Sequence, residues 1–159
     1  MRLSGYRPGG SGERRAQRRA PDALALGRRE EVIAIGAAPR TILIVDDEPA
    51  VRALLRDALE PAGLRLAEAA DGSEALETAW RDQPDLVLLD VGLPHLSGVN
   101  VCRALKTNPH APRVILMTGN ATEIDTASCG ADGVVAKPFR PDALLRLVLS
   151  FEPQPASVS

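Results

Sequence analysis

The sequence has no long apolar run. None approaches the roughly 20 consecutive apolar residues that a membrane-spanning helix needs, so no membrane span is expected. The N-terminus is rich in arginine, but it has neither a continuous apolar stretch nor a small-residue cleavage site, which argues against a secretory signal. We therefore expect a cytoplasmic protein.

Cysteine and histidine are also sparse, with two of each. Cys102 and Cys129 form no CxxC pair and have no histidine at metal-ligand spacing, so we interpret them as reduced, partly buried thiols. His95 and His110 each follow a proline, and we interpret both as surface loop residues.

Acidic and basic residues are unevenly distributed along the chain. Residues 1–40 hold nine arginines and four acidic residues, a net charge of +5, while residues 41–159 hold ten basic and seventeen acidic residues, a net charge of −7. The first segment has too little apolar surface to offset the entropy lost on ordering. We predict a basic, disordered N-terminal extension over 1–40, a folded domain over 41–150 and a flexible tail over 151–159.

From Thr41 onward, short β-branched and aliphatic runs alternate with stretches of helical periodicity. The predicted strands are 41–45, 64–69, 86–89, 114–117 and 134–136. The predicted helices are 49–60, 72–81, 99–106 and 141–149, with a poor fifth candidate at 120–129. This alternation predicts an α/β fold, in which five helices cover both faces of a five-stranded parallel sheet through right-handed crossovers.

Two of these helices have a predicted buried face. In the helix over 49–60, five apolar residues recur at helical spacing: Val51, Leu54, Leu55, Ala58 and Leu59. In the helix over 72–81, the predicted inward residues are Ala75, Leu76, Ala79 and Trp80.

Polar residues follow most of the predicted strands directly. Asp46 and Asp47 come after the first strand and Asp90 after the third. Thr118 follows the fourth strand and Lys137 the fifth. Ligands bind at the carboxyl edge of open α/β sheets, and Mg2+, which prefers oxygen ligands, relieves the repulsion among crowded carboxylates. A carboxylate nucleophile, a metal, a hydroxyl and a lysine are the parts needed to accept a phosphoryl group.

The segments at these strand ends resemble those of the receiver domain of two-component response regulators, over about residues 41–150. The matching segments are Val45-Asp46-Asp47-Glu48, Asp90-Val91-Gly92-Leu93-Pro94 with Gly98, Met117-Thr118-Gly119, Gly130-Ala131-Asp132 and Lys137-Pro138-Phe139. The resemblance implies a flavodoxin-like, doubly wound sheet with the strand order 2-1-3-4-5 of chemotaxis receivers. In that order the first and third strands are neighbours, and their acidic residues share one crevice.

The resemblance also implies a metal site and a phosphoacceptor. Asp90 is the expected phosphoacceptor, which takes its phosphoryl group from a histidine kinase. A histidine phosphotransfer protein is the other expected partner, to which the phosphoryl group could be passed on. The expected Mg2+ ligands are Asp46, Asp47, Asp90 and the backbone carbonyl of Gly92.

Two further site residues follow from the same resemblance. Lys137 is expected to pair with the acyl phosphate, and its bond to Pro138 is expected to be cis. Thr118 is expected to hydrogen-bond a phosphoryl oxygen, with the alternative that its hydroxyl only satisfies backbone groups of the loop.

The sequence departs from the family pattern in two places. Receivers usually carry an aromatic residue three positions before the lysine, where this chain has Val134. The stretch from Thr118 to Lys137 is also a few residues shorter than usual, so the helix before the fifth strand should be short or irregular. We expect phosphorylation to be retained and signalling to use a modified version of the usual partner-binding face, or another face.

No output domain follows Leu149 in this sequence. We therefore expect a stand-alone receiver without a DNA-binding domain, which is a monomer or a phosphorylation-dependent dimer and signals by changed protein–protein binding. We expect no enzyme activity beyond assistance to its own phosphotransfer and dephosphorylation. Two alternatives are a Mg2+-dependent phosphatase, which would normally need an acidic residue where Gly92 stands, and a pseudo-receiver, against which the intact site residues argue.

Overall fold

The computed structural model describes residues 40–151. The strands are β1 Thr41–Val45, β2 Arg65–Ala69, β3 Leu86–Asp90, β4 Arg113–Thr118 and β5 Gly133–Ala136. The helices are α3 Pro49–Leu59, α4 Gly72–Asp82, α5 Gly98–Leu105, α6 Thr126–Cys129 and α7 Pro141–Ser150, with the 3-10 turns η1 Glu60–Ala62 and η2 Ala121–Glu123. All strand pairs are parallel and their order is β2-β1-β3-β4-β5. The predicted fold class and strand order are confirmed. The predicted extension over 1–40 and tail over 151–159 lie outside the described residues, apart from Arg40 and Phe151.

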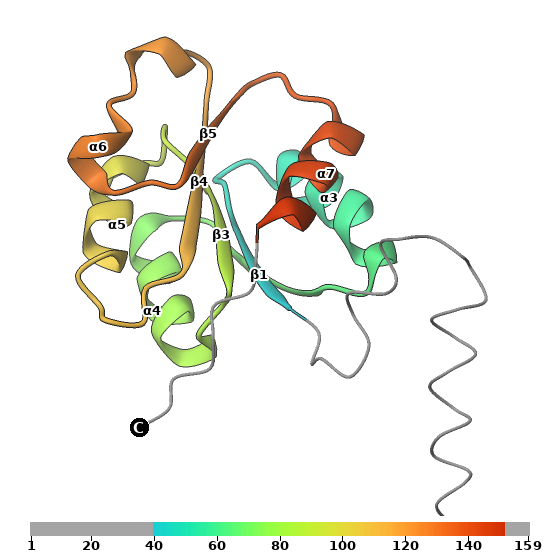
Figure 1. The fold of residues 1–159 in the computed structure, drawn as a ribbon, viewed down its shortest axis with the longest axis horizontal. Coiled ribbons are helices and arrows are strands. Elements are labelled where there is room, and N and C mark those ends of the chain that lie inside the picture. Colours follow the sequence, from blue (N-terminus) through green and yellow to red (C-terminus); the bar gives the residue numbers. More distant parts are fainter. Residues whose placement is uncertain (1–39, 152–159) are drawn as a thin grey trace, which may run out of the picture. The chain divides into compact units, whose positions relative to one another are not determined.

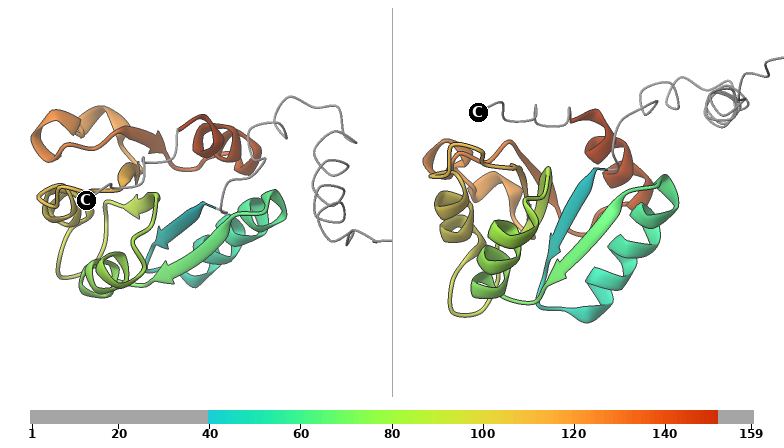
Figure 2. Two further views of the ribbon diagram at one scale, coloured as in Figure 1. Left: turned by 60° about the horizontal axis from the view of Figure 1, so that its bottom comes forward. Right: turned by 90° about the horizontal axis from the view of Figure 1, so that it is seen from below.

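The sheet separates two helical layers. Helices α3 and α7 pack together on one face, and α4, α5 and α6 lie on the other (Figure 1). Two further views keep this separation (Figure 2). Alternate side chains of each strand therefore enter different cores: in β1, Ile42 and Ile44 pack with α3 and α7, while Leu43 and Val45 pack with α4 and α5. Burial on both faces explains why this strand is apolar at every position after Thr41.

Local capping explains where the helices begin. Pro49 occupies the first turn of α3, where its missing N–H costs no hydrogen bond. At the start of α4, the Asp71 carboxylate accepts the N–H of Glu74 at 2.9 Å. The Ser97 hydroxyl accepts the N–H of Asn100 at 3.3 Å at the start of α5. These side chains satisfy backbone donors that have no partner within the helix.

Two apolar side chains that were predicted to be buried are exposed. Leu54 of α3 is 44% exposed, whereas the next residue, Leu55, is buried. Trp80 of α4 is 52% exposed, whereas the residue before it, Ala79, is buried. One step along a helix rotates a side chain by about 100° around the axis, so Leu54 and Trp80 turn away from the sheet although their neighbours face it. In α4 the buried face includes the polar residue Thr78 instead of Trp80.

The connection between β4 and β5 contains little helix, which confirms the predicted irregularity. Apart from the turn η2, it holds only the four residues of α6. The Asp125 carboxylate caps α6 by accepting the N–H of Ala127 at 3.0 Å. The helix ends at Gly130, whose φ of +82° is a conformation that favours glycine.

The cysteines and histidines lie as predicted, with the thiols more deeply buried than expected. Cys102 and Cys129 are free and buried. Burial, together with the neighbouring Cys129 thiol, raises the pKa of Cys102 to about 12. His95 and His110 are exposed in loops. Among residues 40–151 there is no helix of the length and apolarity that a membrane crossing requires.

Candidate functional site

Two aspartates are buried at the carboxyl ends of neighbouring strands. Asp46 follows β1 and is fully buried, and Asp90 is the last residue of β3 with 7% of its surface exposed. Val45 of β1 and Leu89 of β3 are partners in the sheet, so the two aspartates come next along adjacent strands. Buried carboxylates are costly unless they are paired with a cation and hydrogen-bonded.

Lys137 supplies that cation from the residue after β5. Its Nζ lies 2.8 Å from Oδ2 of Asp46 and 3.2 Å from Oδ1 of Asp90. The Lys137 N–H donates to the Thr118 carbonyl at 2.8 Å, and the bond to Pro138 is cis, as predicted. Burial lowers the pKa of Lys137, but the hydrogen bonds and negative charges of the two aspartates outweigh burial, so that its pKa is raised. The ammonium is therefore charged at neutral pH.

The turn after β1 gathers three carboxylates. Oxygens of Asp46, Asp47 and Glu48 lie within 4.8 Å of one another, with Asp47 and Glu48 exposed. Oδ1 of Asp46 accepts the Glu48 N–H at 2.9 Å, which fixes the turn. Asp90 is not in this group and is connected to it through Lys137. Glu48 is missing from the predicted ligands, although its place beside two aspartates at a strand end was a usable signal.

The loop after β3 shapes the space around Asp90. The Gly92 N–H donates to Oδ1 of Asp90 at 3.3 Å. The Gly98 N–H donates to the Val91 carbonyl at 3.0 Å. A Cβ at Gly98 would overlap the backbone carbonyl of Asp90 and lie 2.8 Å from the Val91 Cα, so no larger residue fits without a shift of the loop. For Gly92, the predicted role of the carbonyl as a metal ligand stays a prediction.

Thr118 ends β4 close to the same edge. It is 8% exposed, and its partner in the sheet, Ala136, directly precedes Lys137. The Thr118 Oγ1 accepts the N–H of Asn120 at 3.1 Å, which is the loop-backbone contact that the alternative interpretation foresaw. This bond uses the hydroxyl as an acceptor, so its own proton is available for a second oxygen.

The oxygen atoms at this edge suit a hard divalent cation. Both hydrogen bonds to the Asp90 carboxylate from residues 40–151 end on Oδ1, which leaves Oδ2 with its lone pairs available. The carboxylates of Asp46 and Asp47 are further ligands of the kind that Mg2+ prefers. The carboxylates of Asp46, Asp47, Glu48 and Asp90 outnumber the Lys137 ammonium, so the net charge of this group of residues favours a cation. Arg52 from α3 also donates to the Asp46 carbonyl, a contact that no sequence motif predicted.

Comparison with known proteins identifies the family of this chain. The model of the response regulator receiver domain matches residues 42–149, which is more than half of the chain. The chain belongs to the receiver domain family of two-component response regulators.

The sequence is similar to that of several regulators of transcription. It is 38% identical over 110 residues to the DNA-binding response regulator MtrA of Mycolicibacterium smegmatis, covering 67% of this chain and 48% of the relative. It is 41% identical over 113 residues to the probable transcriptional regulatory protein TcrX of Mycobacterium tuberculosis, covering 69% of this chain and 48% of the relative. The chain therefore spans about half the length of these curated relatives.

These relatives show that one prediction about partners is wrong. We expected a stand-alone receiver with no DNA-binding output, yet the similar proteins are named as DNA-binding or transcriptional regulators. The error arose because the prediction relied on where the sequence ends. The motifs at the strand ends lie within the receiver domain, so they carry no information about the output.

Solved structures support the same fold. The chemotaxis protein CheY4 of Vibrio cholerae superposes with a TM-score of 0.66 at 28% identity, covering 70% of this chain and 97% of that one. A putative response regulator from Chloroflexus aurantiacus has a TM-score of 0.65 at 34% identity, covering 70% and 95%. The response regulator DrrB of Thermotoga maritima, described as an OmpR/PhoB homolog, has a TM-score of 0.64 at 31% identity, covering 70% and 51%.

Proposed function

We propose that Asp90 is the phosphoacceptor of this receiver domain and that a histidine kinase is the donor. The observation that carries the proposal is the pair of buried carboxylates, Asp46 and Asp90, bridged by the ammonium of Lys137 at the carboxyl edge of the sheet. Oδ2 of Asp90, which is not hydrogen-bonded by residues 40–151, is the attacking oxygen. It forms a P–O bond while the P–N bond of phosphohistidine breaks, and the electron pair leaves with the imidazole nitrogen.

The neighbouring residues would stabilise the transferred group. Asp46, Asp47 and Asp90, with the carbonyl of Gly92, would hold Mg2+, which supplies positive charge against the phosphoryl oxygens when it is bound. Lys137 adds a point charge from the side of β5. These charges act where negative charge accumulates during phosphoryl transfer, which is where electrostatic stabilisation is most effective.

We infer that phosphorylation changes the affinity of the domain for other protein surfaces. A phosphoryl group that binds one conformation better shifts the equilibrium towards it. Val134 is partly buried against the core beside α4 and α5 and has no ring to move between positions, so the switch must use other parts. The short α6 supports a modified signalling face. The names of the relatives make control of transcription the output class that we propose for this regulator.

A phosphatase is less well supported by the site. Gly92, two residues after Asp90, has no side chain to act as a general acid or base towards a leaving group. We therefore propose a signalling protein, which acts on its own phosphoryl group and on no external substrate.

Phosphorylation by acetyl phosphate tests the proposal. The wild type, Asp90→Asn and the control Asp132→Asn are incubated with and without Mg2+, and the products are read by intact mass. Asp132 is a suitable control because it is also a partly buried carboxylate paired with a lysine, Lys106, but lies elsewhere. We expect a single phosphoryl adduct in the wild type and the control, dependent on Mg2+ and lost in Asp90→Asn. An adduct that persists in Asp90→Asn, or no adduct at all, would contradict the proposal.

A further inference from the structure

Arg52 joins three elements next to the acidic turn. From α3, its Nη1 donates to the backbone carbonyl of Asp46 at 2.7 Å, and its Nε donates to Oε1 of Glu68 on β2 at 3.0 Å. The side chains of Arg52 and Glu68 are 19% and 27% exposed. The guanidinium is rigid and planar. When its N–H groups donate to two acceptors, it therefore fixes the position of one acceptor relative to the other.

Asp46 is consequently held through its main chain as well as its side chain. Its N–H donates to the Ala69 carbonyl at 3.2 Å, and its carboxylate accepts from the Glu48 N–H and from Lys137. Its carbonyl accepts from Arg52. The backbone of residues 46–48 determines where the three carboxylates lie, so a side chain that fixes this backbone bears on metal binding.

Arg56, one turn further along α3, provides a natural comparison. Glu68 pairs with Arg52 through Oε1 and with Arg56 through Oε2. The Arg56 side chain is 40% exposed and also lies 3.5 Å from Glu60. The two arginines thus share a helix and a carboxylate, but of these two only Arg52 hydrogen-bonds to Asp46.

We propose that Arg52, held by Glu68, is a positioning residue for the turn at residues 46–48 and thereby sets the affinity of the site for Mg2+. The inference rests on the proposed function, because it takes this turn to hold the ion. If Arg52 acted only through its charge, its removal should tighten Mg2+ binding, because a guanidinium near the turn repels a divalent cation. Loss of positioning weakens binding, because the ligands must then be ordered when the ion binds.

The test measures Mg2+ binding to the unphosphorylated protein by isothermal titration calorimetry. It compares the wild type with Arg52→Gln, Arg52→Lys and the control Arg56→Gln. We expect Arg52→Gln to raise the Kd for Mg2+ by about tenfold, as is typical when a residue that orients a metal ligand is lost. Arg52→Lys, which keeps the charge but not the planar guanidinium, should also weaken Mg2+ binding. This variant tests the proposal if Arg52→Gln does not fold. Arg56→Gln should leave the Kd near the wild-type value.

Backbone amide spectra of the metal-free proteins provide a readout that does not depend on Mg2+. Resonances of residues 46–48 should shift in Arg52→Gln and stay in place in Arg56→Gln. Unchanged or tighter Mg2+ binding in Arg52→Gln, or equal weakening in Arg56→Gln, would overturn the positioning role while leaving the proposed function intact. Absence of Mg2+ binding in the wild type would overturn the proposed function and this inference together.

Discussion

The proposed acceptor site lies at the carboxyl edge of the sheet, where the connection between β4 and β5 also begins, but the two regions are held in different ways. Lys137 contacts Asp46 and Asp90, which lie 91 and 47 positions away in the sequence. In the connection from residue 119 to residue 129, side chains bond to close neighbours, as Asp125 does with Ala127, and of the four residues of α6 only Cys129 is buried.

This difference separates what each region depends on. The site requires long-range order in the sheet, because β1, β3 and β5 must bring its residues together. The connection from residue 119 to residue 129 depends on local caps and turns, so its shape can change at little cost to the site. Substitutions in the two regions should therefore have separable effects on phosphorylation and on local structure.

Among changes that leave Asp90 in place, breaking the long-range contacts of Lys137 should have the largest effect on phosphorylation. Lys137→Met keeps most of the length of the side chain but removes the ammonium between Asp46 and Asp90. The rate of phosphorylation by acetyl phosphate should fall about a hundredfold, the usual loss when one group that stabilises developing negative charge is deleted. Timed intact-mass measurements provide the rate. A variant that reacts as fast as the wild type would show that Lys137 has no part in the transfer.

Crowding the loop around Asp90 should reduce stability. Gly98→Ala places a Cβ against the Asp90 carbonyl and 2.8 Å from the Val91 Cα, and should lower the free energy of unfolding by about 1–3 kcal/mol, the usual cost of overpacking. Urea denaturation measures this change. The control Gly119→Ala has no atom within 4 Å of the new Cβ, and should change stability by less than about 0.5 kcal/mol. Equal losses in both variants would argue against the packing explanation.

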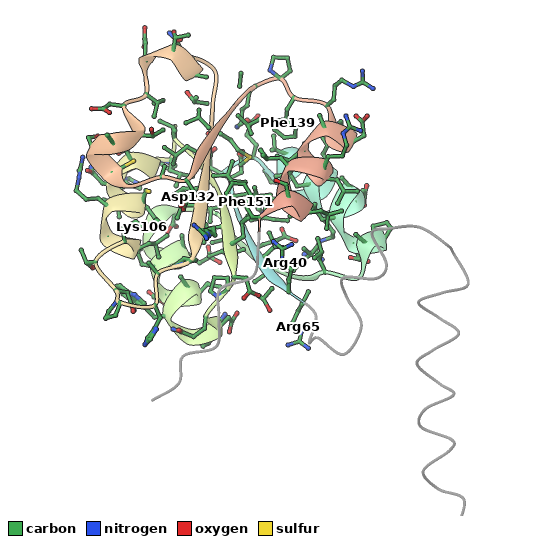
Figure 3. The ribbon with its side chains drawn as sticks, viewed as in Figure 1. Arg40, Arg65, Lys106, Asp132, Phe139 and Phe151 are labelled. Carbon is green, nitrogen blue, oxygen red and sulfur yellow. The ribbon has the colours of Figure 1, made fainter. Side chains whose placement is uncertain are left out.

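The Asp132 cluster should affect stability in a pH-dependent way and leave phosphorylation unchanged. Asp132 lies beside Lys106 (Figure 3), which contacts it at 2.7 Å, and accepts the Val114 N–H at 2.8 Å. Burial raises the pKa of Asp132, but Lys106, this N–H and Arg113 outweigh burial and hold the pKa below its usual 3.8. The carboxylate therefore stabilises the fold above the unfolded pKa, and this contribution is lost as the pH falls through the folded pKa.

Unfolding of the wild type and Asp132→Asn across pH measures this contribution. The wild type should be more stable at neutral pH, and the difference should shrink as the solution is acidified below the ordinary range of a carboxyl group. A difference that stays constant with pH would show that the charge of Asp132 does not contribute.

The smallest effect is expected from the cap of α6. Asp125→Ala removes the acceptor for the Ala127 N–H, which should cost about 0.5–2 kcal/mol of helix stability locally. Hydrogen exchange at Ala127 and Ser128 should become faster while the phosphorylation rate stays at the wild-type value. A clear loss of phosphorylation in this variant would contradict the separation between the connection and the site.

Much of the site was predictable because buried parallel strands leave a plain pattern in sequence. An apolar run that ends in a charged residue marks both the strand and its carboxyl edge. This pattern located Asp46, Asp90 and Lys137, which the structure brings into contact. Their roles in phosphorylation are still predictions.

Other features depend on geometry that a local pattern does not encode. The exposure of Leu54 and Trp80 depends on how far each helix is rotated about its axis. The bridge from Arg52 to Glu68 and Asp46 depends on the approach of α3 to β2, and each of these residues looks like an ordinary surface charge in the sequence. Glu48 was missing from the predicted ligands, although the sequence places it directly after the two aspartates.

The most direct test is to locate the phosphoryl group within the chain. Borohydride reduces an acyl phosphate on aspartate to homoserine, a stable mark that peptide mass spectrometry can read. After treatment with acetyl phosphate and Mg2+, we predict homoserine at position 90 and at no other acidic residue. Homoserine at position 46 or 47, or no conversion at position 90 in a protein that carries a phosphoryl adduct, would contradict the assignment of Asp90 as the acceptor.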